Sequence, residues 1–183
     1  SHHAHRHDHD SLVDAVAQSH AARFDNLWWG FVDTYAHAHP FRVVDFGTGP
    51  ALLVQDLCER FPDAEIIGVD AQPEMLAHAE QLLEPFENAR VIAHDLASPP
   101  IPGLEDAQTD LVIASMVLHE MSVPTLALDE AFRVLAPGGT LLIYDWMRHP
   151  LSLFSSEERP HEQNSFTRFS AHCRFTADDY AWL

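Results

Sequence analysis

The feature that most constrains this chain is the stretch from Arg42 to Ala51, which reads R-V-V-D-F-G-T-G-P-A. A β-branched apolar run ends in an acidic residue, passes two glycines within three positions, and continues into an apolar helical pattern. Glycine takes positive φ angles without a steric penalty and lets the backbone approach a bound group closely. The stretch therefore predicts a strand, a tight turn and a helix start, with a binding site at the turn.

A second acidic residue lies at the spacing that is typical of nucleotide binding. Residues 65–70 read as a second strand that ends in Asp70. This carboxylate follows the glycines by about 20 residues, the distance at which an acid meets a ribose diol in nucleotide-binding βαβ units. A glycine turn alone is weak evidence, and the second acid strengthens it.

Three more strands are expected, over residues 89–94, 109–114 and 140–144, each separated from the next by helical or loop segments. Alternating strands and helices require parallel pairing with right-handed crossovers, so the strand ends converge on one crevice. The predicted fold class is α/β, a Rossmann-like, doubly wound and mostly parallel sheet with N-terminal helices.

From these motifs onward the chain resembles the class I S-adenosylmethionine-dependent methyltransferases, in particular their small-molecule branch. The resemblance covers roughly residues 41–146 and rests on V-V-D-F-G-T-G at 43–49, G-V-D at 68–70, H-D-L at 94–96, D-L-V-I-A-S at 110–115 and L-A-P-G-G at 135–139. One departure is Pro50, where many members carry a small residue. We expect it to be tolerated, because proline suits the first turn of a helix.

The resemblance implies S-adenosyl-L-methionine as cofactor and a small-molecule methyl acceptor as partner. Asp95 and Leu96 match the family position at which a carboxylate accepts a hydrogen bond from the adenine amino group and the next residue packs on the ring. Asp95 can instead cap a turn. The implied cofactor-binding residues are Asp45, Gly47, Thr48, Gly49, Asp70, Ala71, Met75, Asp95, Leu96 and Ser115.

Four regions are expected along the chain: a His-rich tail at 1–10, an N-terminal helical cap at 11–40, the cofactor-binding core at 41–150, and a lid with the start of a C-terminal helix at 151–183. Family members usually continue into a final antiparallel strand pair, so that pair is expected to be missing from a truncated chain. In the cap, most of an apolar stripe with helical spacing is expected to pack on the sheet. The stripe comprises Phe24, Leu27, Trp28, Phe31, Val32 and Tyr35. By resemblance, Trp28, Trp29 and Tyr35 are also candidates for the wall of the acceptor pocket.

His119, in the loop after the fourth strand, is the first candidate for a catalytic base or an acceptor contact. A base is needed only when the acceptor is protonated at neutral pH, as a hydroxyl or an ammonium is. Weaker candidates at the same rim or in the expected lid are Glu120, Asp145, His149 and His172. Asp45 and Glu120 can also balance the positive charge of the cofactor.

Composition excludes several function classes. The chain has 28 acidic residues against 10 basic ones, a formal charge of −18, and such a surface repels nucleic-acid phosphates. No apolar run is long enough for a membrane span, and the N-terminus is not signal-like. Cys58 and Cys173 form no metal-ligand spacing, and Cys58 is expected as a buried thiol. A cytoplasmic enzyme is expected, without a metal, and its oligomeric state stays open, a homodimer being one option.

Two alternatives stay open. A nicotinamide-dependent oxidoreductase uses a similar first turn, but here Leu52 stands where the third glycine of G-x-G-x-x-G belongs. A non-catalytic S-adenosylmethionine- or metal-binding protein on a methyltransferase core is the other, and the histidine tract at 1–10 favours it, because neutral imidazoles bind Zn²⁺, Ni²⁺ or Cu²⁺.

Overall fold

The computed structural model describes residues 14, 16–35, 42–146 and 176–182. Within these ranges, one parallel sheet has the strand order β3-β2-β1-β4-β5. Its strands are β1 (Arg42–Phe46), β2 (Glu65–Asp70), β3 (Ala89–Ala93), β4 (Thr109–Ser115) and β5 (Leu135–Tyr144). The chain order reverses direction at β1, so the sheet is doubly wound, and the predicted α/β fold class is confirmed.

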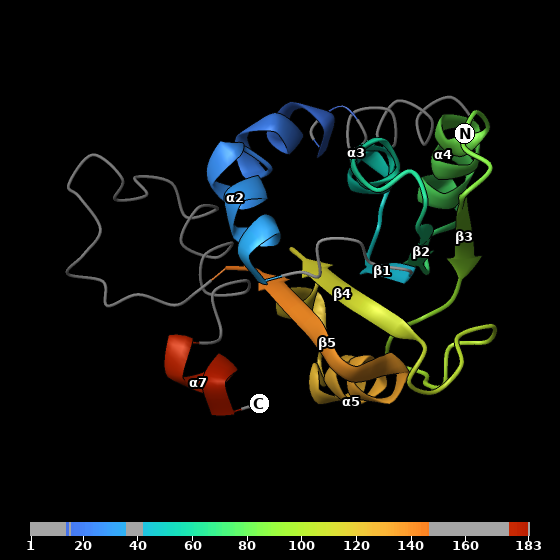
Figure 1. Ribbon diagram of the computed structural model, residues 1–183. Coiled ribbons are helices and arrows are strands. Elements are labelled where there is room, and N and C mark those ends of the chain that lie inside the picture. Colours follow the sequence, from blue (N-terminus) through green and yellow to red (C-terminus); the bar gives the residue numbers. More distant parts are fainter. Residues whose placement is uncertain (1–13, 15, 36–41, 147–175, 183) are drawn as a thin grey trace, which may run out of the picture.

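Helices cover both faces of this sheet (Figure 1). Helices α3 (Leu52–Arg60) and α4 (Pro73–Leu83) lie on one face, with α2 (Asn26–Tyr35) beyond the end of β5 on the same side. Helix α5 (Thr125–Val134) lies on the other face. Side chains alternate between the two faces along a strand. In β1, accordingly, Val43 enters the apolar cluster under α3 while Val44 enters the one over α5.

The N-terminal cap is a bent pair of helices. Residues 16–23 are helical, Phe24 and Asp25 form a bend, and α2 follows. The carboxylate of Asp25 accepts the main-chain N–H groups of Leu27 at 2.9 Å and Trp28 at 3.0 Å. This side-chain cap satisfies amides that the first turn of α2 leaves without an internal partner, which explains why a second helix starts here.

The apolar stripe of the cap is only partly buried. Phe24, Trp28 and Val32 are 8%, 7% and 0% exposed, whereas Leu27 is 81% and Phe31 48% exposed. The buried residues are spaced four apart and form one row, while Leu27 and Phe31 stand one position earlier and turn away from the sheet. The stripe thus packs on the core through Phe24, Trp28 and Val32 but not through Leu27 and Phe31, and the side chain of Tyr35 lies outside the described residues.

The fifth strand begins earlier than expected, at Leu135 instead of Thr140. Thr109 pairs with Leu135 and Leu111 with Thr140, so a register irregularity takes up residues 136–139 within the strand. Helix α5 already ends at Val134. The A-P-G-G segment that follows forms a bulged start of β5, which a proline and two glycines permit.

Several smaller expectations can be checked. Cys58 is buried, as predicted, and burial raises the pKa of its thiol to about 11. Pro50 lies in a turn ahead of α3, so it is not in the first turn of the helix as expected. No helix in the described ranges has the length and apolar character needed to cross a bilayer. The tail at 1–10, His37–Pro40, His149, His172 and Cys173 lie outside the described residues.

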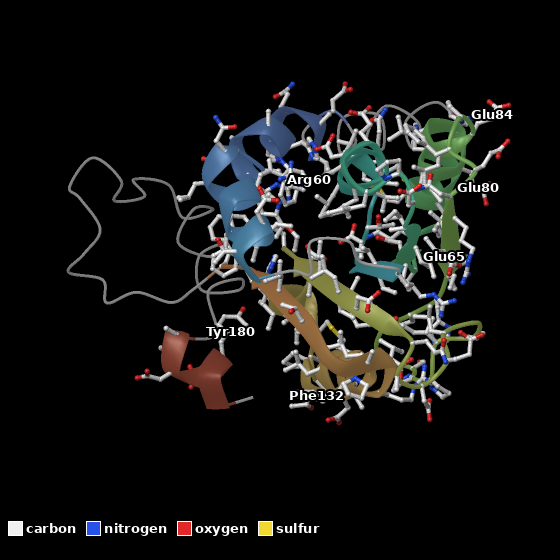
Figure 2. The ribbon with its side chains drawn as sticks, in the orientation of Figure 1. Arg60, Glu65, Glu80, Glu84, Phe132 and Tyr180 are labelled. Atoms are coloured by element: carbon white, nitrogen blue, oxygen red, sulfur yellow. The ribbon has the colours of Figure 1, made fainter. Side chains whose placement is uncertain are left out.

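A short helix, α7 (Ala177–Trp182), follows Thr176. The Thr176 Oγ1 accepts the Asp179 N–H at 3.1 Å, and the Asp179 carboxylate accepts the Thr176 N–H at 2.7 Å, a reciprocal cap. The predicted helix start is confirmed. From α7, Tyr180 is directed toward the end of β5, and its hydroxyl donates to the Trp146 carbonyl at 3.3 Å (Figure 2).

Candidate functional site

A cavity of about 720 Å³ opens at the carboxyl ends of the strands. It is bounded by the glycine turn after β1, the ends of β2, β3 and β4, and the helix over residues 16–23. Every residue predicted to bind the cofactor lines it, and so do His119 and Glu120. Because parallel strands end at the same edge, residues far apart in the sequence meet here, as the strand pattern predicted.

The glycine turn is fixed by main-chain bonds to β2. The N–H groups of Gly47 and Thr48 both donate to the Val69 carbonyl, at 2.8 and 3.0 Å. Gly47 and Gly49 have φ angles of +71° and +55°, and Ala51 also has a positive φ of 64°. The turn therefore needs glycine for its backbone conformation, while Ala51, with its small side chain, tolerates the left-handed region just ahead of α3.

The two glycines of the turn differ in their surroundings. A Cβ added to Gly47 would lie 2.6 Å from the Cγ2 of Val117, so the loop after β4 packs directly on this glycine. A Cβ added to Gly49 would meet nothing within 4 Å. Gly47 thus joins two loops, and Gly49 presents its backbone to the open cavity.

Asp70 connects the glycine turn to the next helix. Its Oδ2 accepts the Gly49 N–H at 2.8 Å, and its Oδ1 accepts the Gln72 N–H at 2.8 Å. Both oxygens are held in place by the main chain. Each carboxylate oxygen has a second lone pair, so Asp70 can still accept hydrogen bonds from a bound ligand.

Asp45 is a buried carboxyl at the floor of the cavity, 2% exposed. Burial raises its pKa to about 7, and the nearby charge of Asp70 adds to the rise, while the Thr48 hydroxyl and the Arg23 guanidinium oppose it. A cation entering the cavity would favour the ionised form of Asp45. The residue is therefore suited to meet a positively charged ligand.

Among the buried polar atoms of the cavity wall, the Arg23 Nε and the Ser115 Oγ, like the Thr48 Oγ1, have no hydrogen-bond partner within the described residues. Burial lowers the pKa of Arg23 from its ordinary value, against the effect of Tyr144 and Asp45. Buried polar groups are normally satisfied, so these two indicate a ligand that completes them. Arg23 is not among the residues predicted from the sequence, because it lies outside every motif, on the helix over residues 16–23.

At the end of β3, Asp95 forms a turn. Its Oδ1 accepts the Ala97 N–H at 2.8 Å, and its main-chain carbonyl accepts the Ser98 N–H at 2.9 Å. The turn-capping alternative for Asp95 is thus observed. The turn uses only one carboxylate oxygen, so the other can still accept a hydrogen bond in the role that the resemblance implies. Leu96, next in sequence, is buried and also lines the cavity.

Residues after β4 and β5 form an apolar part of the cavity wall, next to a histidine–aspartate pair. The wall comprises Met116, Val117, Met121, Val123, Leu126 and Trp146. The His119 Nδ1 lies 2.5 Å from the Asp145 Oδ1, with the side chains 6% and 1% exposed. Met116 has a positive φ of 57°, which is uncommon for a residue with a long side chain and concentrates at functional sites.

The candidate wall residues of the cap do not all reach the cavity. Trp28 and Trp29 are absent from its lining, and Trp28 is packed in the core between Phe24 and Tyr144. The prediction for these two is wrong, because the bend turns α2 away and leaves the preceding helix over the cavity, through Val16, Ser19 and His20. His20 also fastens this helix to α3, with its Nε2 2.7 Å from the Asp56 Oδ2.

No group of three or more His, Cys, Asp or Glu side chains within the described ranges is arranged to hold a metal ion. The histidine tract at 1–10 lies outside those ranges, so its metal binding stays a hypothesis from the sequence.

Comparison with known proteins identifies the family. A family model described as a methyltransferase domain matches residues 43–139, more than half of the chain. The chain belongs to the class I S-adenosylmethionine-dependent methyltransferases. The resemblance stated from its motifs is confirmed, with S-adenosylmethionine as methyl donor, and the nicotinamide alternative is set aside.

Similar proteins come from its small-molecule branch. The chain is 31% identical over 194 residues to a demethylmenaquinone methyltransferase of Deinococcus radiodurans, covering 96% of this chain and 77% of the relative. It is 38% identical over 108 residues to a trans-aconitate 2-methyltransferase of Methylobacterium nodulans, covering 58% of this chain and 38% of that relative. Among solved structures, an S-adenosylmethionine-dependent methyltransferase from Aquifex aeolicus has a TM-score of 0.65 at 20% identity, covering 88% of this chain and 86% of that one.

Proposed function

We propose that this methyltransferase transfers the methyl group of S-adenosylmethionine to an apolar, uncharged small molecule. The observation that carries the proposal is the apolar part of the cavity wall formed by Met116, Val117, Met121, Val123, Leu126 and Trp146. A pocket of this composition gains most from burying an acceptor of the same polarity. The donor's sulfonium makes its methyl group electrophilic, and orientation of the acceptor alone can lower the barrier by about 7–11 kcal/mol.

The lining residues at the glycine turn and at the ends of β2 and β3 fit the donor. Asp70, held by two main-chain amides, would accept from the ribose hydroxyls. Asp95 and Leu96 would contact the adenine. The amino-acid part of the donor carries a carboxylate and an ammonium, and these would satisfy Arg23 and Ser115, whose buried polar atoms have no partner in the described part of the chain. Asp45, Gly47, Thr48, Gly49, Ala71 and Met75 would complete this half of the site.

The relatives transfer methyl groups to unlike acceptors by name, demethylmenaquinone and trans-aconitate. Trans-aconitate is a tricarboxylate, and a chain of formal charge −18 with Glu120 at the rim repels such an anion. The apolar wall favours an acceptor of the first kind. We therefore rank a quinol-like aromatic above a polycarboxylate.

Donor binding is tested by isothermal titration with S-adenosylhomocysteine. Native protein is expected to bind it, and Asp70→Asn to lose about 100-fold in affinity, because two charge-assisted hydrogen bonds weaken. The matched control is Glu74→Gln, an exposed acid in the first turn of α4 that does not line the cavity. Absence of binding to the native protein would overturn the proposal, as would equal affinities in the two variants.

The acceptor is tested with tritiated S-adenosylmethionine and two probes, 1,4-dihydroxynaphthalene and trans-aconitate. Methyl transfer to the first and none to the second is the expected result. A Met121→Glu variant should lose the aromatic activity while it keeps S-adenosylhomocysteine affinity, since this change only places charge in the apolar wall. Transfer to trans-aconitate alone would refute the ranking. Donor binding without transfer to any acceptor pool would favour a non-catalytic binder.

A further inference from the structure

We propose that Asp145 is a positioning residue that keeps the proton of the His119 ring on Nδ1, so that Nε2 receives a proton from the acceptor. The proposal rests on the proposed function, which supplies the donor and the site, and it deepens that function by naming what the acceptor must carry. It assigns a role to a carboxylate that no motif marks.

The pair is formed by the ends of two neighbouring strands. His119 lies in the short 3₁₀ helix (Leu118–Glu120) that follows β4, and Asp145 directly follows β5. The two strands pair up to Ser115 and Tyr144, so their continuations start side by side. The Met116 N–H donates to the Tyr144 carbonyl at 2.7 Å, which extends this pairing one residue past β4.

Asp145 is built to act as an acceptor. Its Oδ1 accepts the Trp146 N–H at 2.7 Å and its Oδ2 accepts the His119 N–H at 3.2 Å. The carboxyl is buried, and a buried charge is retained only when it is paired and hydrogen-bonded. With two main-chain donors on a carboxylate that only accepts, the contact of 2.5 Å to the His119 Nδ1 has the histidine as donor.

In the neutral ring, this contact also determines the protonation state of the other ring nitrogen. A neutral imidazole carries one proton, so a proton on Nδ1 makes Nε2 the acceptor. The Nε2 lies on the side of Glu120, 3.8 Å from its Oε1, and both residues line the cavity. The Trp146 ring is inclined at 51° to the imidazole with a centroid distance of 6.4 Å, and it helps to hold the ring plane.

The pair defines the acceptor's chemistry. The acceptor atom forms its bond to the methyl carbon as the methyl–sulfur bond of the donor breaks, and that bond's electron pair stays on sulfur. The acceptor's proton passes to the His119 Nε2, and the Asp145 carboxylate balances the resulting imidazolium. The acceptor is therefore one that carries a removable proton, a hydroxyl or an acidic ring position. A thioether or tertiary amine would gain nothing from the pair.

The first test needs no substitution. Nitrogen-15 NMR of the histidine rings in the native protein with bound S-adenosylhomocysteine, with His119 assigned by its loss in His119→Gln, reports which ring nitrogen carries the proton. The expected spectrum at neutral pH has a protonated Nδ1 and an unprotonated Nε2. A proton on Nε2 alone, or on both nitrogens up to the pH at which the protein unfolds, would overturn the proposal.

The second test is a double-mutant cycle on methyl transfer to 1,4-dihydroxynaphthalene. His119→Ala and Asp145→Asn are each expected to lower kcat about 100-fold, within the range of general-base catalysis. The double variant should be no slower than His119→Ala, because Asp145 acts only through His119. If the kcat losses of the two single variants multiply in the double variant, Asp145 has a merely structural role. Asp129→Asn, an exposed acid on α5, is the matched control.

The two proposals fail in different ways. Loss of S-adenosylhomocysteine binding in the native protein removes the proposed function. Normal binding with the proton on Nε2 removes only the role of Asp145. If 1,4-dihydroxynaphthalene is not methylated, the ring spectrum alone decides, and Asp145→Asn must move the His119 proton away from Nδ1 for the proposal to stand.

Discussion

Charged side chains at the two ends of the sheet differ in where they find their partners. At the amino ends of the strands, the Glu65 carboxylate forms ion pairs with the Arg42 Nε at 2.7 Å and the Arg90 Nε at 3.1 Å. The buried Glu130 carboxylate pairs with the Arg133 Nη2 at 2.6 Å. At the carboxyl ends, Asp45 is buried with its pKa raised, and Arg23 and Ser115 have polar atoms without a partner in the described chain. The charged groups named at the amino ends are paired within the fold, whereas Asp45, Arg23 and Ser115 present polar atoms to the cavity.

This contrast separates stability from function. Burial works against ionisation of Glu130, but the hydrogen bonds of Arg133 and of the Ile101 N–H outweigh it and hold the pKa of Glu130 below its ordinary value. At Asp45 burial prevails. Burial thus ends in opposite net pKa shifts at the two carboxyls, depending on whether the fold or a ligand supplies the partner. The predictions below test that difference.

The largest expected effect is at the amino end. Arg133→Met leaves the Glu130 carboxyl buried without its cation and should lower the free energy of unfolding by about 3–5 kcal/mol, measured by urea denaturation. S-adenosylhomocysteine affinity should be unchanged in the folded protein. The matched control is Arg60→Met, which breaks an exposed pair with Asp33 and should cost less than about 1 kcal/mol. Equal losses in the two variants would contradict the contrast.

The next effect is at the carboxyl end and depends on pH. The Asp45 pKa is about 7 in the folded protein against 3.8 ordinarily. Between these values the folded state keeps a proton that the unfolded chain has lost. Stability without ligand should therefore fall as pH rises from about 4 to about 7, by up to about 4 kcal/mol from this group.

The control for this pH dependence is Asp45→Asn, which has no carboxyl to titrate at this position. Its unfolding free energy should exceed that of the native protein above pH 7, and the gap should close toward pH 4. Parallel curves for the two proteins would show that burial does not control Asp45.

The smallest effects compare the two glycines of the turn. Gly47→Ala combines a positive φ with a clash against Val117 and should cost about 3 kcal/mol, whereas Gly49→Ala meets only open space and should cost about 1 kcal/mol. Gly30→Ala, in α2 with normal φ and open surroundings, is the control and should stabilise by about 0.5–1 kcal/mol. Equal unfolding free energies for the two turn variants would contradict the packing of Val117.

Much of the core could be predicted from the sequence because local pattern determines it. The strands around the glycine turn and Asp70 match their expected bounds, and the cofactor residues meet in one cavity. The roles of these residues remain predictions, since location alone does not measure binding.

What the sequence did not yield depends on tertiary packing. Arg23 lines the cavity from the helix over residues 16–23, which ends at a bend before α2, and no periodicity marks that bend. Leu27 and Phe31 fit the apolar stripe, yet one step of the helix turns them outward. Asp145 was a weak candidate in isolation, and its partner became visible only when β4 and β5 were seen to pair.

The packing of Val117 on Gly47 has a consequence for how such an enzyme diversifies. The loop after β4 rests on the glycine turn after β1, so a larger side chain at this contact would displace both parts of the cavity lining together. Met121, Val123 and Leu126 also line the cavity but are not part of this contact, so we expect substitutions there to change the cavity wall without displacing the glycine turn. The fold thus leaves one part of the cavity lining freer to vary than the other.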